Sequence, residues 1–339
     1  MNFCIQCGRE LVPGSNCACL VHQPATLKFS CDATGSALLG LYLKTLLLSI
    51  VTLGIYSFWG RAEIRRYLYN STLAGDDRFA WHGTGRELLL GWLKAAGFIC
   101  GFYTIYFGLI LASKTYGPLL GALFFYLLLL AIAPYVIVGV LRYRLSRTSL
   151  RGIHFGCRAD AREFGKIYYK NLILTILTLG LYSPWFVSNI RAFLAPNCWY
   201  GDQPFDYDGQ GKDLFRSWLL FIVLLLPTLY LVAFWYAAKQ ERYVVGHTTW
   251  RLARMNSTLR GRDILWLMLS NLALIVCTLG IGLPWARLRT VRLHCRTTTV
   301  ENFTGFEPVR QRTMAATATG ESIGSLLEVD SDVGGGFGL

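Results

Sequence analysis

The sequence predicts a polytopic α-helical membrane protein with about six hydrophobic segments in duplicated units, short β-hairpins between them and a small N-terminal zinc ribbon. Three observations lead to this fold class. Of the 339 residues, 53% are hydrophobic and only 16% are charged, whereas soluble domains carry about 25% charged residues. The charges are absent from several long runs, and one eight-residue phrase comes three times in the chain.

The hydrophobic segments are long enough to cross a bilayer, which takes about 20 apolar residues per helix. Lys44 is the one charged residue in 38–59. The stretch 88–141 holds only Lys94 and Lys114 and has room for two helices with a turn between them. Three runs without any charge complete the set of six segments, and they are 171–190, 217–238 and 264–286.

The repeated phrase reads TLGIYSFW at 52–59, TLGLYSPW at 178–185 and TLGIGLPW at 278–285. Its glycines favour the end of a helix, and its prolines cannot continue one. Its aromatic residues suit the boundary between membrane and water. We therefore interpret the phrase as a structural helix exit at the membrane interface; the alternative is a broken helix that lines a substrate site. The residues that carry this interpretation are Gly54, Tyr56, Trp59, Gly180, Tyr182, Trp185, Gly280 and Trp285.

A predicted β-hairpin follows each of the first two copies of the phrase. Residues 65–88 and 191–214 both contain an aromatic-rich polar run, a Gly-Asp turn and the pattern Phe-x-x-x-Gly-x-Gly. The turns are Gly75-Asp76 and Gly201-Asp202. Gly and Asp favour tight turns, and flanking aromatic residues favour strands.

The spacing of these elements predicts two long copies and the start of a third. The element 142–155 matches 242–255. The interval before this element runs from Gly85 to Arg142 in the first copy, but only from Gly211 to Arg242 in the second. The difference in length corresponds to about one membrane helix with a turn. The second copy has therefore either lost one span or compressed a helical pair around Pro227.

This pattern predicts three domains. Residues 1–26 form the zinc ribbon, 27–307 the membrane domain and 308–339 a Gly/Ala/Thr/Ser-rich tail that we expect to be disordered. Within the membrane domain, the copies span about 29–155 and 156–255, with a partial third copy at 256–307.

Four of the ten cysteines lie near the N-terminus, at Cys4, Cys7, Cys17 and Cys19. The Cys-x-x-Cys-Gly sequence is typical of a zinc ribbon, and four thiolates would hold a structural Zn²⁺ with no open position for a substrate. So small a module would depend on the metal for its folding. Two alternatives are His22 in place of one thiolate and a disulfide in an oxidising compartment.

The net charge of +13 comes mainly from basic residues that flank the hydrophobic segments. This is typical of cytoplasmic loops in membrane proteins. The alternative is specific binding of anionic lipid or nucleic acid, and we expect no nucleic-acid partner. If six simple spans follow an N-terminus outside the cell, three basic loops lie inside it. These loops are 60–87, 142–167 and 239–263, with five, seven and six Lys and Arg. A thiolate ribbon prefers the reducing cytoplasm, so the alternative is that the phrase-ending segments enter the membrane and return.

The pattern T-L-G-[IL]-Y-S-x-W, followed by the hairpin and Phe-x-x-x-Gly-x-Gly, resembles the YjgN-like family of bacterial inner-membrane proteins, a domain of unknown function (DUF898). The resemblance covers roughly 27–307, and Gly282 departs from it because Tyr56 and Tyr182 stand at its position. It implies a multi-pass protein of the bacterial inner (cytoplasmic) membrane, for which an N-terminal zinc ribbon is a common companion. It brings no established activity and no catalytic residues. The segments that carry the resemblance are 52–59, 79–85, 142–155, 178–185, 205–211 and 278–285.

No motif in the sequence predicts an enzyme, and we expect none. We expect a membrane scaffold or adaptor whose partners are the lipid bilayer and a cytosolic protein docked by the ribbon. The alternative is a transporter or channel built on the duplication, with Asn171, Ser270 or Asn271 lining its cavity. A membrane-surface enzyme would instead bring His82, Asp208 and arginines together in one pocket.

Overall fold

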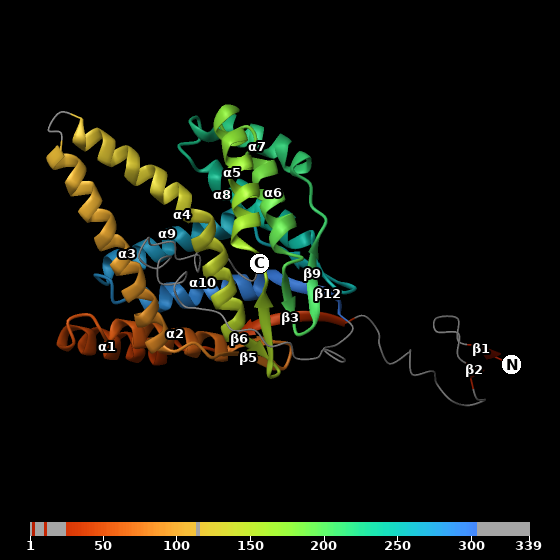
Figure 1. Cartoon of the computed structure of the whole chain (residues 1–339). Helices are drawn as coiled ribbons and strands as arrows, with labels where there is room; N and C mark the ends of the chain where they lie inside the picture. The colour runs from red at the N-terminus through yellow and green to blue at the C-terminus, as the bar shows by residue number, and fades with distance from the viewer. Residues whose placement is uncertain (1, 4–9, 12–24, 113–115, 304–339) are drawn as a thin grey trace.

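The computed structural model describes residues 2–3, 10–11, 25–112 and 116–303 of the chain. Ten strands form a closed antiparallel barrel, in which each strand pairs with its neighbours in the sequence. The last strand, β12 (Thr298–Phe303), pairs with the first, β3 (Ala25–Cys31), and closes the ring. Figure 1 shows the strands gathered at one end of the molecule, with the helices extending upward and to the left from them. Two short strands, β1 (Asn2–Phe3) and β2 (Glu10–Leu11), pair with each other.

The barrel consists of five units of one design: a strand, two helices and a second strand that pairs with the first. Short turns join one unit to the next, so the pairs of helices, called hairpins 1 to 5 after their units, all leave from the other end of the barrel. Unit 1 contains β3, α1 (Gly35–Val51), α2 (Ser57–Asn70) and β4 (Thr72–Ala74). Unit 2 contains β5 (Asp77–Trp81), α3 (Gly85–Ala112), α4 (Gly117–Arg147) and β6 (Thr148–Leu150).

Units 3 to 5 repeat the design with shorter helices. Unit 3 contains β7 (Ile153–Cys157), α5 (Ala161–Leu177), α6 (Ser183–Leu194) and β8 (Cys198–Tyr200). Unit 4 contains β9 (Gln203–Tyr207), α7 (Gly211–Leu225), α8 (Val232–Gly246) and β10 (Thr248–Trp250). Unit 5 contains β11 (Ala253–Ser257), α9 (Gly261–Cys277), α10 (Leu283–Thr297) and β12.

The units recur at a constant spacing, with one exception. Strands β6, β8, β10 and β12 begin at 148, 198, 248 and 298, at equal spacing. Strand β4 begins at 72, so the distance along the chain from β4 to β6 is longer than the distance between the later strands. The additional length lies in α3 and α4, which have 28 and 31 residues against 12 to 17 in the other eight described helices of the units. Unit 4 keeps both of its helices around Pro227, so it is compressed relative to unit 2 and has lost no helix.

Side chains fill the interior of the barrel. The first strand of each unit places an aromatic residue or methionine at the same position, and the ring of Phe79 stacks on Phe29 and Phe155 with centroids 6.4 and 6.3 Å apart. Tyr200 then links Phe155 to Trp250, with centroids 4.7 and 5.6 Å apart. Small barrels commonly fill their interior in this way. The equivalent residues are Phe29, Phe79, Phe155, Phe205 and Met255.

Adjacent units interlock through tryptophan and glycine. A Cβ atom on Gly85 would lie 2.6 Å from the Cα of Trp59, and one on Gly211 would lie 2.6 Å from the Cα of Trp185. Glycine is therefore required at these two positions, where the first helix of one unit packs against the second helix of the unit before it. The same contact joins Gly261 to the Cα of Trp235, whereas a Cβ atom on Gly35 would meet the indole ring of Trp285 across the closure of the ring.

A side-chain to backbone hydrogen bond also links adjacent units. Arg142 donates to the carbonyl of Ala159 at 2.7 Å, and Arg242 donates to the carbonyl of Leu259 at 3.0 Å. Arg292 makes the equivalent bond across the closure. The remaining members are Arg66 to Gly83 at 3.5 Å, Ser188 to Gly209 at 2.7 Å and Arg292 to Ala33 at 2.6 Å.

The predicted fold class is wrong, because the molecule is not a bundle of six membrane-spanning segments. In the described part of the chain, only α3 and α4 contain segments long and apolar enough to cross a membrane, at 85–108 and 117–147. The other predicted spans are short helices that reach a tight turn and come back to the barrel. The error has a physical reason: hydropathy summed over a window does not register a reversal of the chain inside that window.

The strand pairs that the sequence predicted are present, but as parts of the closed barrel. Ala74 pairs with Asp77 around Gly75-Asp76, and Tyr200 pairs with Gln203 around Gly201-Asp202. The long copies expected at 29–155 and 156–255 each correspond to two of the five units, and 256–307 corresponds to the fifth.

The predicted zinc ligands Cys4, Cys7, Cys17 and Cys19, with His22, lie outside the described residues, as does the predicted tail 308–339. Within the described ranges, no group of three or more His, Cys, Asp or Glu could hold a metal ion. The zinc ribbon therefore has no support from the structure, and bound zinc stays a prediction.

Candidate functional site

The most unusual surface of the molecule is at the outer ends of the helical hairpins, here called the tips. Leu53, Leu179 and Leu279 occupy the same position in three tips and are 94, 93 and 94% exposed. Leu229 takes this position in the fourth and is 83% exposed. The repeated phrase thus forms the turn between the two helices of a hairpin. The tips are 52–56, 178–182, 226–231 and 278–282.

The tip leucines also have a strained backbone. Their φ angles are +50° at Leu53 and +49° at Leu179 and Leu279, in the left-handed region. This conformation costs a non-glycine residue about 1–2 kcal/mol. Exposure to water offers no compensation, whereas burial of a leucine side chain in hydrocarbon stabilises by about 1.5–3 kcal/mol. The tips are therefore built for an apolar surrounding.

The backbone of each tip satisfies its hydrogen bonds internally. In hairpin 3, the Thr178 hydroxyl donates to the carbonyl of Leu174 at 2.7 Å and accepts from the N–H of Tyr182 at 3.1 Å. The N–H of Gly180 donates to the carbonyl of Thr175 at 2.7 Å. Thr52, Thr228 and Thr278 bridge the other tips in the same way. Internal bonding is the main requirement for a peptide backbone in hydrocarbon.

The uncharged part of each hairpin sets how deeply it could enter a membrane. In hairpin 3 no charge lies in 171–190, so the uncharged ends of α5 and α6 extend about 10–12 Å at 1.5 Å per residue. In hairpin 2 the uncharged runs are 95–112 and 117–141, which extend about 27 and 37 Å. The hydrocarbon core is about 30 Å thick, so only hairpin 2 matches its full depth.

Charged residues gather at the inner ends of the helices, next to the barrel. Glu241 of α8 lies 3.2 Å from the Nδ1 of His294 in α10, and His294 is buried. Burial lowers the pKa of Arg191 in α6, and this shift is partly offset by Tyr207, Cys198 and Glu241. Arg191, Glu241 and His294 therefore form a polar cluster on the barrel-proximal parts of α6, α8 and α10.

A histidine cluster lies at the base of hairpin 2. The Nε2 of His82 is 2.8 Å from the hydroxyl of Ser149, and its ring is 4.9 Å from that of His154. Burial lowers the pKa of His82, and the positive charges of His154, Arg66 and Arg147 lower it further. Arg147 in turn forms an ion pair with Glu87 at 2.6 Å. This base is electropositive and favours the neutral form of His82.

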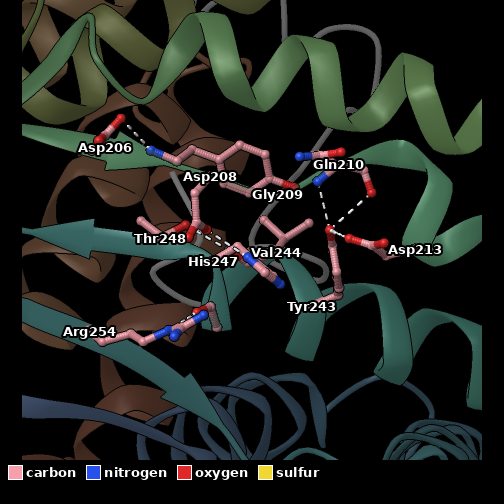
Figure 2. A network of polar contacts seen from close by, with 12 residues as sticks. Asp206, Asp208, Gly209, Gln210, Asp213, Tyr243, Val244, His247, Thr248 and Arg254 are labelled. Carbon is pink, nitrogen blue, oxygen red and sulfur yellow. Dashed lines mark hydrogen bonds and ion pairs between the residues drawn. The ribbon is translucent and has the colours of Figure 1, made fainter.

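The equivalent base of hairpin 4 carries the network shown in Figure 2. The Nδ1 of His247 lies 2.6 Å from Asp208, and the His247 ring lies 4.2 Å from that of Tyr243. The Tyr243 hydroxyl donates to Asp213 at 2.7 Å and accepts from the N–H of Gln210 at 2.6 Å. Burial, reinforced by the bond to Asp213, raises the pKa of Tyr243. These bonds fix the end of α8 against the start of α7.

The residues proposed for a membrane-surface enzyme are not brought together. His82 and Asp208 hold equivalent positions, but in units 2 and 4, and their bonded partners differ. The polar residues proposed for a transporter cavity lie in separate hairpins. Asn171 accepts from Asn189 at 2.7 Å within hairpin 3. In hairpin 5, Asn271 donates to the carbonyl of Ala286 at 3.3 Å and Ser270 donates to that of Leu267 at 3.2 Å.

The structure places the residues of the repeated phrase in two settings. Gly54, Gly180 and Gly280 form the turns, with φ of +89°, +91° and +92°. The tryptophans Trp59, Trp185 and Trp285 pack against the glycines of adjacent units. Tyr56 donates to Glu63 at 3.3 Å, and Tyr182 accepts from Asn189 at 3.4 Å. Their position at the membrane interface stays a prediction.

Sequence reasoning missed the fivefold repeat, although two signals mark it. The first helix of a unit begins with Gly-Arg/Lys-Asp/Glu at 85–87, 211–213 and 261–263, and with Ala-Arg-Glu at 161–163. The acidic residue accepts a hydrogen bond near the helix start, as Asp263 does from the N–H of Arg260 at 3.2 Å. The second signal is TLYLVAFW at 228–235, a copy of the phrase in which Tyr230 replaces the glycine at φ +66°.

A closed barrel that carries helical hairpins with uncharged, leucine-bearing tips defines a class of membrane-associated protein with approximate fivefold repetition. The chain belongs to the family described as bacterial protein of unknown function (DUF898), whose model matches residues 26–233 and 219–326. The predicted membership of the YjgN-like family is thereby confirmed.

The curated relatives are inner membrane proteins. The chain is similar to the inner membrane protein YjgN of Salmonella typhimurium, with 32% identity over 140 residues, which is 41% of this chain and 33% of the relative. Its similarity to YjgN of Escherichia coli K12 is 28% over 152 residues, 45% of this chain and 36% of the relative. The matches thus span about a third of the relatives' length. Their names support an inner-membrane location, and no solved structure matches the chain.

Proposed function

We propose that this protein is a scaffold of the bacterial inner membrane, in which the helical hairpins enter the bilayer from the cytoplasmic face and hold the barrel against it. The tips carry this proposal. They have no charged residues, their leucines are almost fully exposed, and their backbone is hydrogen-bonded internally. Such a surface is unstable in water and suits hydrocarbon.

The connectivity supports one common side of the membrane for the ten strands of the barrel. Each hairpin starts and ends on strands that pair with each other, so both of its ends lie at the same face of the membrane. Hairpin 2 is long enough to reach the opposite face, while the other hairpins end within the nearer leaflet. The basic residues near the barrel favour the cytoplasm as that face.

A scaffold accounts for the barrel better than a channel does. The barrel axis is occupied by stacked rings from Phe29 to Trp250, which argues against a path for solutes along it. The turn end of the barrel, opposite the hairpins, would then face the cytoplasm and be the surface offered to a protein partner.

Thiol labelling in intact cells and in inside-out vesicles tests this arrangement. Leu252 lies in the turn between β10 and β11 and is 78% exposed, and Cys277 is exposed next to a tip. With a membrane-impermeant maleimide read by peptide mass spectrometry, Leu252→Cys should react only in inside-out vesicles. Cys277 should react in neither preparation until detergent is added.

Two results would contradict the proposal. Reaction of Leu252→Cys in intact cells would place the barrel in the periplasm. Reaction of Cys277 in inside-out vesicles, at a rate similar to that of Leu252→Cys, would place the tip of hairpin 5 in water. Detergent-solubilised protein, in which both cysteines must react, is the control for reactivity itself.

A further inference from the structure

Unit 3 differs from the other units at the base of its hairpin. Cys157, the last residue of β7, pairs with Cys198, the first residue of β8. Both thiols are buried, with 2% and 0% exposure, and both are free. In the other four units, the second strand has a threonine at this position, and its partner in the first strand varies from unit to unit. Those pairs are Cys31 with Thr72, Trp81 with Thr148, Tyr207 with Thr248 and Ser257 with Thr298.

The register places the two cysteines at the closest kind of cross-strand position. The N–H of Arg158 donates to the carbonyl of Asn197 at 2.8 Å, and that of Gly201 donates to the carbonyl of His154 at 3.2 Å. Hydrogen-bonded pairs alternate with non-hydrogen-bonded pairs in antiparallel strands, so Cys157 and Cys198 form a non-hydrogen-bonded pair. The Cα atoms of such a pair lie about 4.5 Å apart, within the range of about 4.4–6.8 Å that a disulfide requires.

The two thiols are also chemically unequal. A hydrogen bond from Cys198 lowers the pKa of Cys157. A hydrogen bond from the backbone of Ala159 and the charge of Arg142 lower it further, and together these effects outweigh burial, which raises it. The same thiol–thiol bond, together with burial, raises the pKa of Cys198. A thiolate is the nucleophile in disulfide exchange, so Cys157 is the residue that would attack first.

We propose that Cys157 and Cys198 are a site of reversible oxidation to a disulfide by low-molecular-weight disulfides. The Cys157 thiolate attacks one sulfur of the small disulfide, which forms a mixed disulfide and releases one small thiolate. That thiolate takes the proton of Cys198, whose sulfur then attacks the Sγ of Cys157 and releases the second small thiol after protonation. Two protein thiols are oxidised to one disulfide, and one small disulfide is reduced to two thiols.

The bond would close the base of hairpin 3. Cys157 precedes α5 and Cys198 follows α6, so the disulfide joins the two strands from which this hairpin leaves the barrel. Arg142 donates to the carbonyl of Ala159, two residues after Cys157, at 2.7 Å. We expect slow oxidation in the native protein, because both thiols are buried and the reagent reaches them only when the base of the hairpin opens.

The test uses the full chain in detergent with glutathione disulfide as the oxidant. Free thiols are alkylated after incubation, and peptides are identified by mass spectrometry without reduction. We expect a peptide linking Cys157 to Cys198, lost on treatment with dithiothreitol and absent from Cys198→Thr, which restores the residue of the other units. Cys100 and Cys277, which are exposed on α3 and α9, should form only mixed disulfides with glutathione.

Pseudo-symmetry supplies a matched positive control. In the Cys198→Thr background, Thr72→Cys creates an opposed pair with Cys31 at the equivalent position of unit 1. If this engineered pair oxidises while Cys157 and Cys198 of the wild-type protein stay reduced under the same conditions, the proposal is overturned. A mixed disulfide on Cys157 that never resolves to the internal bond overturns it too, as does a failure of both pairs to oxidise.

Discussion

Individual tip residues carry the argument for membrane insertion. Leu179 is almost fully exposed at a positive φ, while Thr178 and Gly180 next to it bind the polar groups of the turn. A water-soluble turn would place a polar residue or glycine where the leucine stands. An exposed leucine beside a turn whose polar groups are already bonded is stable if the turn is surrounded by lipid.

At the same scale, glycine sets the contact between units. Gly211→Ala should destabilise the protein by about 1–3 kcal/mol, because its Cβ would lie 2.6 Å from the Cα of Trp185. Gly246→Ala is the control, because apart from its chain neighbours and the backbone of its own helix no described atom lies within 4 Å of a Cβ at that position. Thermal unfolding in detergent measures both. Equal melting temperatures for the two variants would show that the Trp185 contact is not tight.

Tyr200 gives a prediction about pH. Its hydroxyl donates to the carbonyl of Leu150 at 2.9 Å inside the barrel, and burial raises its pKa to about 12. The unfolded chain loses this proton near pH 10. The group therefore stabilises the fold fully below about pH 10, and this contribution is lost as the pH rises through 12.

The phenolate absorbance of the wild type minus that of Tyr200→Phe should show this titration. We expect the difference to develop near pH 12 or only on unfolding. A difference that develops near pH 10 in the folded protein would mean that Tyr200 is in contact with water.

The roles of single residues were partly predictable from the sequence. The glycines of the repeated phrase end their helices because a local rule about backbone conformation suffices. For the tryptophans, the sequence predicts only a place at the membrane interface. Their glycine partners lie in the next unit, as Gly85 does for Trp59, and no local rule connects two positions so far apart in the chain.

At the scale of elements, hairpin 2 stands apart from the others by its length. Tyr116, at the start of α4, is exposed at the outer end of hairpin 2, and Leu229 is exposed at the tip of hairpin 4. An impermeant maleimide added to intact cells should label Tyr116→Cys, because α3 and α4 reach the far face of the membrane. Leu229→Cys should stay unlabelled in the same cells, because its hairpin ends inside the bilayer.

Labelling of both positions in intact cells would mean that the short hairpins also cross the membrane. Protection of both would mean that hairpin 2 does not cross it. Both variants must react after solubilisation in detergent.

Hydropathy predicted where the helices lie in the sequence, but not whether each one crosses the bilayer or turns back within it. The charge-free runs coincide with the hairpins, because an apolar surface is needed whether a helix crosses a bilayer or returns within it. The direction of the chain after each turn depends on the strands that close the barrel. Those strands are short and have little sequence signal of their own.

At the scale of the whole molecule, closure of the ring makes the first and last units neighbours. Arg292 bonds to the carbonyl of Ala33, as Arg142 bonds to that of Ala159 within the chain. Loss of a hydrogen bond from a charged group costs about 1.5–3 kcal/mol. Arg292→Ala and Arg142→Ala should therefore lower the melting temperature by similar amounts.

Arg296→Ala is the control for this pair, because Arg296 lies on the same helix as Arg292 and is exposed. If Arg292→Ala behaves like Arg296→Ala while Arg142→Ala is clearly destabilised, the barrel is open between β12 and β3 in solution.

This closure is the feature that the sequence conceals most completely. The phrase is clear in units 1, 3 and 5 and altered in unit 4, so the visible repeat has twice the true period. Because the helices of unit 2 are longer, the interval between the phrases of units 1 and 3 is also longer than that between units 3 and 5. Only the pairing of β12 with β3, across almost the whole chain, reveals five units in a ring.

Depth measurement by spin labelling tests whether the tips lie in hydrocarbon while the barrel lies in water. Labels are attached to Leu53→Cys, Leu179→Cys, Leu229→Cys or Leu279→Cys in lipid vesicles, with Leu252→Cys at the turn end of the barrel as the reference. We predict that the tip labels collide readily with oxygen and rarely with a water-soluble nickel complex, with the reverse at Leu252→Cys. Equal access of the nickel complex to the tips and to Leu252→Cys would show that the tips lie in water.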